Sequence, residues 1–156
     1  MAGLQDIGLD LSPEGKAAIS RLEELRGLVI EAGFQADQTA EDGETSLAEI
    51  AYWNHFGTVD KDGQVMIPAR PFMDTLDLQQ DQLFEFSGQA LEALGSSREV
   101  AEAIGSKAKS MIQDAIRNGD WAPNAPSTIK KKGSDKPLID TGTMRQGVQY
   151  VIKEGQ

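Results

Sequence analysis

The first amphipathic segment of the chain lies near its beginning. Ser12 and Pro13 suit an N-cap and a first helical position, and Gly27 suits the end of the helix that they open. The apolar positions between these signals recur every three or four residues, at Ala18, Leu22 and Leu25. The pattern predicts a short amphipathic helix over 13–26.

A capping box precedes the aromatic part of the sequence. Ser46 is followed three residues later by Glu49, the spacing at which the two side chains can satisfy amides of a first helical turn. Gly57 then supplies a stop signal. We therefore expect a helix over 47–56, whose apolar positions are Leu47, Ile50, Ala51, Tyr52, Trp53 and Phe56.

Two longer apolar stripes follow. Pro71 suits a first helical position, and the stripe after it predicts one continuous long helix that closes at Gly95. Its members are Phe72, Leu76, Leu83, Phe86, Ala90 and Leu94. Ser96 and Glu99 form a second capping box, which opens a helix with the stripe Val100, Ile104, Ala108, Met111, Ile112 and Ala115. Because only a short turn separates the two helices, we expect them to lie close together.

Alternating apolar positions predict two strands, over 28–35 and 147–153, which can pair with each other. The better-buried face of the first strand carries Leu28, Ile30, Ala32 and Phe34, and that of the second carries Val148, Tyr150 and Ile152. The acidic segment 37–45 lacks periodicity and is predicted to be a loop. Segment 58–70 should be an extended or hairpin-like loop, and 119–140 an extended arm rich in proline, glycine and lysine.

These elements predict an α+β fold in which a small antiparallel sheet packs against two long helices and one or two shorter ones. The 156 residues fit a single domain, 1–156, and the 39% hydrophobic content is that of a folded chain. No apolar run approaches the roughly 20 residues that span a bilayer, and no secretory signal opens the sequence. We therefore expect no membrane association. Cysteine is absent, so disulfides and thiolate metal sites are excluded.

Charge is unevenly distributed along the chain. Residues 1–100 carry 19 acidic and 6 basic side chains, whereas residues 101–156 carry 6 acidic and 9 basic ones. The net charge of −10 repels nucleic-acid phosphates, which argues against tight or sequence-specific DNA binding. The acids can equally serve solubility alone.

Candidate chemistry is sparse, and the sequence predicts neither an enzyme nor a bound cofactor or metal. His55 is the only histidine, and no serine has the G-x-S-x-G setting of an activated nucleophile. We interpret His55 as a packed or surface residue. Asp60, Asp62 and Gly63 resemble part of a calcium loop, but the glycine is misplaced and the distal glutamate is missing, so a turn is expected. A further group of acids, Asp74, Asp77 and Asp81, is interpreted as a solvated helix face.

The segment KKKG, residues 130–133, can be a solvated basic turn or an anion contact. Its lysines, with Lys136, also suggest a protein contact. The acids of the 37–45 loop, Glu41, Asp42 and Glu44, could pair with them across a boundary between two copies and fix the register of assembly.

Two sequence clusters carry a family resemblance. The first is AEIAYWNHFGT, residues 48–58, followed by IPARPFM, residues 67–73. The second is WAPNAPSTIKKKGSDKPLIDTGTMRQGVQYVI, residues 121–152. In order and spacing they resemble the tail-component family of tailed bacteriophages, the tail-completion or virion-morphogenesis proteins. The chain departs from that family's pattern at His55, where an acidic residue is common.

The resemblance implies a structural virion protein that forms a homo-oligomeric ring in the neck, where head and tail join. The sixfold tail favours a hexamer. The implied partners are head–tail connector proteins and the tail terminator or tail tube, with DNA passing through without specific binding. The implied location is the virion, at the neck or tail end, and the host cytoplasm during assembly. An acidic regulatory or nucleic-acid-mimicking binding protein is the alternative that the charge allows.

The residues expected to contact a subunit or partner, or to brace the chain internally, come from these clusters. They are Trp53, Phe56, Arg70, Phe72, Trp121, Lys130, Lys131, Lys132, Asp140, Thr141 and Gly142. Pro68 and Pro71 hold the backbone extended around Arg70, whose guanidinium can then reach a carboxylate or a carbonyl. Asp140 is expected to cap a turn, and Trp121 can either meet a neighbour or pack over the long helices.

Overall fold

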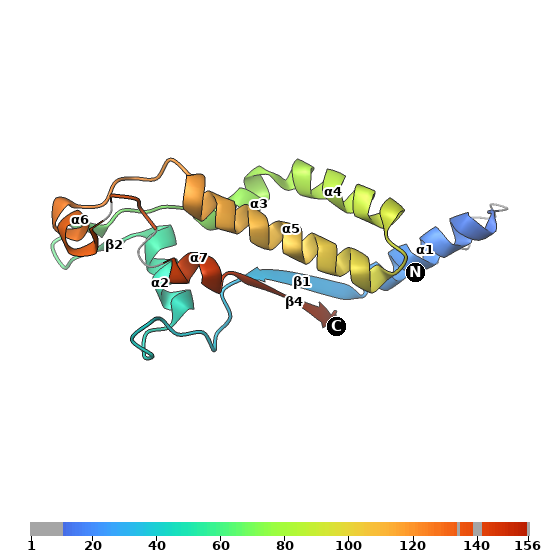
Figure 1. Ribbon diagram of the computed structural model, residues 1–156, viewed down its shortest axis with the longest axis horizontal. Helices are drawn as coiled ribbons and strands as arrows, with labels where there is room; N and C mark the ends of the chain where they lie inside the picture. Colours follow the sequence, from blue (N-terminus) through green and yellow to red (C-terminus); the bar gives the residue numbers. More distant parts are fainter. Residues whose placement is uncertain (1–10, 134, 139–141, 156) are drawn as a thin grey trace.

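The fold is α+β and elongated (Figure 1). This computed structural model describes residues 11–133, 135–138 and 142–155. The longest helix, α5 (Ser97–Asn118), lies in the middle, with α4 (Gln80–Ala93) packed on one side and a two-stranded sheet on the other. The predicted combination of a small antiparallel sheet and two long helices is confirmed.

The sheet joins segments from opposite parts of the chain. Strand β1 (Leu28–Gly33) pairs antiparallel with β4 (Gln149–Glu154), so that Leu28 lies opposite Glu154 and Gly33 opposite Gln149. This is the predicted pairing. The apolar face of β1 is half-buried beneath α5, and its other face is exposed, because side chains alternate across a strand.

The capping box that opens α5 is complete. The Ser96 hydroxyl accepts from the Glu99 amide, and the Glu99 carboxylate accepts from the Ser96 amide at 3.1 Å. The predicted stripe of α5 faces inward, with Val100, Ala108 and Ile112 buried. Helix α4 lies along α5, as the short connection between them predicts.

The single long helix predicted after Pro71 is wrong. The chain forms a 3₁₀ turn, η2 (Phe72–Asp74), then α3 (Thr75–Leu78) and, after a break at Gln79, α4. Gln79 leaves helical geometry with φ −116° and ψ 26°, and its side-chain amide donates to the Thr75 hydroxyl at 2.8 Å. Pro71 precedes the 3₁₀ turn and so is not a first helical residue of α4.

The helix α2 (Leu47–Phe56) has the predicted bounds but not the predicted cap. Ser46 occupies the N-cap position, yet its hydroxyl makes no capping hydrogen bond. After Gly57 the chain forms the hairpin of β2 (Thr58–Val59) and β3 (Val65–Ile67), in agreement with the expected hairpin-like loop. Gly57 has φ +76°, and an added Cβ would lie 2.7 Å from the Ile67 carbonyl oxygen, so a side chain there is excluded.

The arm at 119–140 is only partly extended, which corrects the prediction. Residues 119–125 have no regular structure, but Pro126 opens a short helix, α6 (Pro126–Lys132), which ends at the left-handed Gly133. A second short helix, α7 (Thr143–Gly147), leads into β4.

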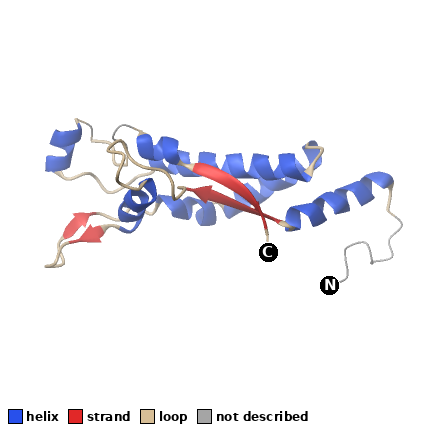
Figure 2. Ribbon diagram, turned by 90° about the horizontal axis from the view of Figure 1, so that it is seen from below, coloured by secondary structure: helices blue, strands red, loops and turns tan. Residues whose placement is uncertain are grey.

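The main core lies where α2, η2, α7 and the second half of α5 meet. It consists of Ala51, Phe72, Ile112, Ile116, Leu138, Met144 and Val148. The predicted first helix, α1 (Pro13–Arg26), contributes no fully buried residue and projects from the other end of the molecule (Figure 2). Ser12 caps it as predicted, accepting from the Gly15 amide at 3.2 Å.

Candidate functional site

Arg70 is the centre of the best-connected polar cluster. Its side chain is only 4% exposed, and four oxygens surround the guanidinium. Nε donates to the Ala122 carbonyl at 3.0 Å, and Nη2 to the Pro123 carbonyl at 3.4 Å and to Asn124 Oδ1 at 3.0 Å. Nη1 donates to Asn54 Oδ1 at 3.2 Å. We name this cluster of Arg70, Asn54, Asn124 and the two carbonyls the Arg70 junction.

Burial has an electrostatic effect on Arg70. Loss of hydration lowers the pKa of Arg70 from its ordinary value, because a low-dielectric surrounding disfavours the charged form. The four acceptor oxygens replace part of the lost water contact. The partners among the described residues are neutral, so the guanidinium here binds backbone and amide oxygens, which was one of its two predicted options.

The backbone of Arg70 is also tied to α2. Its amide donates to the Asn54 carbonyl at 2.9 Å and more weakly to the His55 carbonyl at 3.2 Å. These carbonyls belong to the last turn of α2, whose acceptors have no partner within the helix. The extended path that Pro68 and Pro71 impose thus delivers both the main chain and the side chain of Arg70 to the end of α2.

Asn124 and Asn54 are functional members of the junction that the sequence did not reveal. Asn54 anchors its own side chain by donating Nδ2 to the Ile50 carbonyl at 2.9 Å. Asn124 is buried and donates Nδ2 to the Lys136 carbonyl at 3.3 Å. In the sequence, Asn54 lies between aromatic residues in YWNHF and Asn124 follows Trp-Ala-Pro, but neither setting indicates a hydrogen bond to Arg70.

The aromatic residues beside the junction have separate roles. Phe72 is fully buried and packs edge-on against Phe34, so it is a core residue and not a contact surface. His55 lies against Phe72, its Nδ1 accepts from the Met73 amide at 3.4 Å, and its Nε2 lies 3.4 Å from Asp74 Oδ1. Both ring nitrogens are therefore engaged, as expected of a packed histidine.

Trp121 folds back on its own chain. It is half-buried against the main core, and its Nε1 donates to the Ala115 carbonyl at 2.7 Å, near the end of α5. Gly119 permits this return, because an added Cβ would lie 2.3 Å from the indole ring. Of the two options left open by the sequence, self-packing over the long helix is the one observed in the single chain.

Other predicted residues are exposed. Phe56 is 63% exposed and its ring lies against that of Tyr52 at a tilt of 51°, with ring centroids 4.7 Å apart, and Trp53 is also exposed. Lys130 and Lys131 are exposed on α6, where Lys132 is the last residue. Asp140 and Thr141 lie outside the described residues. Gly142 has φ +87° and is the N-cap of α7, with no side-chain cap bond.

An open groove of about 780 Å³ lies beside the Arg70 junction. Arg70 and Asn124 line it, together with Met66 of the hairpin. Glu41, Asp42 and Lys131 line the same groove. The acidic loop and the basic helix that were expected to meet across two copies thus already face a common groove within one chain.

The acidic loop uses its carboxylates locally. Asp42 accepts from the Thr45 hydroxyl at 2.6 Å and from the amides of Thr45 and Glu44, and these bonds lower the pKa of Asp42 below its ordinary value. Glu41 accepts from the Thr143 hydroxyl at 3.0 Å. The bonds of Asp42 shape the loop, and the bond from Thr143 to Glu41 ties the loop to α7. The inter-subunit pairing of this loop with the lysines stays a prediction.

The acidic residues of the hairpin and of the segment after Pro71 do not gather around a common point. Asp60 Oδ1 accepts from the amides of Asp62 and Gln64, both at 2.9 Å, which makes the segment a hairpin turn. Asp74, Asp77 and Asp81 are exposed. Within the described part of the chain, no three potential ligands cluster as a metal site, and no helix is long and apolar enough to cross a membrane.

Comparison with known protein families, with curated proteins and with solved structures gives no match to this chain.

Proposed function

We propose that the protein is a structural component of a tailed-phage virion, a tail-completion or neck protein that forms a ring between head and tail. The observation that carries the proposal is the Arg70 junction. Its arginine comes from IPARPFM, Asn54 from AEIAYWNHFGT and Asn124 from WAPNAPS. The three segments that resemble the phage family are therefore parts of one spatial unit.

The junction supports a structural role. Its buried cation donates hydrogen bonds to segments on both sides of Arg70 along the chain, as far as Asn124, 54 residues away, an arrangement that fixes geometry and exposes no reactive group. A ring component needs such rigidity, because small errors in the shape of each copy accumulate around a closed ring.

The chain also displays apolar surface that a single copy leaves uncovered. Val59, Val65 and Met66 are each more than 60% exposed on the β2–β3 hairpin, at one end of the molecule (Figure 1). Exposed apolar side chains that gather in one region are typical of protein contact sites. We propose that this end contacts a neighbouring component of the neck, either a copy of the chain, the connector or the tail tube.

The decisive experiment is deletion of the gene in the phage or prophage that carries it. We expect DNA-filled heads and separate tails in electron micrographs of the lysate, with joining restored by the wild-type gene in trans. Normal virions from the deletion would contradict the proposal.

Complementation with variants refines the same test. Arg70→Lys should restore fewer joined virions than the wild-type gene, and the shortfall should match the fraction of the variant that is not folded. Arg98→Lys, which changes an exposed arginine, should restore joining fully. A protein that stays monomeric at every concentration and competes with DNA for an enzyme would instead favour the acidic binding protein.

A further inference from the structure

The outer face of α4 has three properties that the fold of one chain does not explain. Phe84 is 72% exposed, and Leu78, just before the helix, is 82% exposed. Asp81 lies one helical turn before both Phe84 and Glu85, at i+3 and i+4, and both acids are exposed. The segment 75–93 has four acidic side chains and no basic one.

The third property of this face is that it carries a glycine, Gly88. It lies in the interior of α4, four residues after Phe84 and therefore on the same face. Glycine weakens a helix interior relative to alanine. An added Cβ at Gly88 would meet no atom within 4 Å, so packing within the chain does not require the absence of a side chain. A close approach by something outside the chain would require it.

The end of the molecule that the β2–β3 hairpin and α6 form has exposed apolar and basic side chains. The β2–β3 hairpin exposes Val59, Val65 and Met66, and α6 exposes Lys130 and Lys131. Met66 and Lys131 line the same groove, so the apolar and basic side chains adjoin one surface. Of the hairpin acids, Asp60 is engaged in its own turn. Figure 1 shows α6 and the hairpin at one end of the molecule, away from the body of α4.

We infer that the outer face of α4 in one copy docks on the hairpin–α6 end of a second copy. Apolar side chains then meet apolar ones, and acids meet lysines, which fixes the register of the contact. Since the two surfaces lie on different parts of the chain, the contact is head-to-tail, and it leaves one surface of each kind available at every step. Such contacts generate a ring if the rotation closes. The inference deepens the proposed function, since it names the interface of the proposed ring.

This interface assigns the lysines a different partner from the one that charge along the sequence suggested. The carboxylates of Glu41 and Asp42 have hydrogen-bond partners within their own chain. The outer acids of α4, by contrast, project from a helix whose inner face is already packed on α5. In the proposed ring, the acidic face of α4 therefore lies between copies.

The test is sedimentation velocity of the full-length protein over a range of protein and salt concentrations. Wild type should associate, and the association should weaken as salt rises. Charge reversal in either Asp81→Lys/Glu85→Lys or Lys130→Glu/Lys131→Glu should weaken it by at least about tenfold. Combining both reversals in one chain should restore association, because each copy then offers swapped charges to the next.

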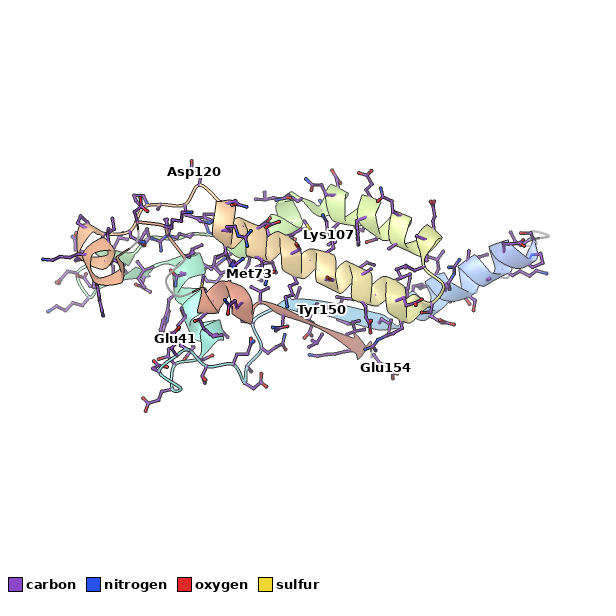
Figure 3. All side chains as sticks on the ribbon, viewed as in Figure 1. Glu41, Met73, Lys107, Asp120, Tyr150 and Glu154 are labelled. Atoms are coloured by element: carbon purple, nitrogen blue, oxygen red, sulfur yellow. The ribbon has the colours of Figure 1, made fainter. Side chains whose placement is uncertain are left out.

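The matched control changes charge equally elsewhere. Asp114→Lys/Glu154→Lys alters two exposed acids away from this face, with Glu154 at the end of β4 (Figure 3), and should leave association unchanged. Phe84→Ser should weaken association without lowering the unfolding midpoint, because the ring of Phe84 is largely outside the fold.

Gly88→Ala provides the sharpest readout. It should raise the unfolding midpoint of the single chain and yet weaken association, two effects that a purely structural role of Gly88 cannot combine. Association that is indifferent to Gly88, Phe84 and the charge reversals would overturn the interface and leave the proposed ring intact. A wild-type protein that never associates would overturn the interface, and normal virions from the gene deletion would separately overturn the proposed function.

Discussion

Arg70 shows how one side chain can organise several segments. Each of its hydrogen-bonding nitrogens faces an oxygen from α2 or from residues 122–124, and these oxygens diverge around a planar group. Lysine has a single ammonium, which cannot reach all the oxygens that are spread around the edge of a planar guanidinium. The identity of the residue, and not only its charge, is therefore required.

Arg70→Lys should lower the free energy of unfolding by at least about 3 kcal/mol, because buried oxygens of the junction lose their donors. Urea titration followed by circular dichroism measures this. The control is Arg98→Lys, whose side chain is exposed and pairs with Glu102 at i+4, and which should change stability by about 0.5 kcal/mol or less. Equal midpoints for the two variants would refute this view of the junction.

Gly105 is a second residue on which packing depends. It lies on α5 where the helix crosses β4, and an added Cβ would lie 2.4 Å from Cδ2 of Tyr150 (Figure 3). The small residue therefore sets how closely the helix approaches the sheet.

Gly105→Ala should destabilise the fold by about 1–3 kcal/mol, even though alanine is the better helix former, because the Tyr150 ring has to move. Gly88→Ala is the matched substitution, in open space on α4, and should stabilise a single copy by about 0.5–1 kcal/mol. Thermal unfolding at concentrations too low for association compares the two. A stabilising Gly105→Ala would show that the helix does not approach the sheet this closely.

At the scale of elements, two serines in similar sequence settings behave differently. Ser96 forms both bonds of its capping box, whereas the hydroxyl of Ser46 makes none. The start of α2 is held instead by pairing with residues 38 and 39. Residues beside Ser46 are held by a bridge between Thr39 and Ser46 and by the Leu47 amide, which donates to the Gln38 carbonyl.

Ser96→Ala should therefore cost about 1 kcal/mol of stability, the usual effect of removing an N-cap hydroxyl. Ser46→Ala should cost clearly less, within about 0.5 kcal/mol. Parallel urea titrations of the two variants check this. Similar losses from both would mean that Ser46 caps α2 in solution.

Local signals account for what the sequence predicted and for what it missed. Caps, glycine stops and apolar periods defined α1, β1, α2, α5 and β4, because each signal acts within a few residues. The sequence does not predict the break at Gln79, because Leu76 and Leu83, seven residues apart, keep the same helical face on either side of it. Helix α6 was missed because its apolar content is low and its three lysines resemble a turn.

The Arg70 junction was only half predictable for a related reason. The two prolines around Arg70 indicated an extended segment that presents a guanidinium. Its partners Ala122, Pro123 and Asn124 lie more than 50 residues away, and no period or spacing connects them to Arg70. Only tertiary packing brings them together.

For the molecule as a whole, stability should be uneven along its length. The main core occupies one end, and α1 at the other end buries no residue fully. The anchors of α1 are few. The Arg21 side chain donates to the Leu94 carbonyl at 2.6 Å, and the Ser97 hydroxyl donates to the Glu24 carboxylate.

Amide hydrogen exchange should reveal this gradient. Peptides from α1 should exchange through local opening that requires little free energy. For the segment of α5 around Ile112 and Ile116, the free energy of opening should approach that of global unfolding. Exchange followed by mass spectrometry, at concentrations where single copies predominate, measures both. Equal protection of the two helices would contradict the gradient.

The register of the sheet has a mechanical consequence. Leu28 lies opposite Glu154, so the first residue of β1 and the last residue of β4 form the pair at one end of the ladder. A pulling force applied at these two residues would load the pairs between the strands one after another, as in opening a zipper, because antiparallel bonds run perpendicular to the strands. Tension between those points would peel β4 from β1 while the core around Phe72 stayed folded.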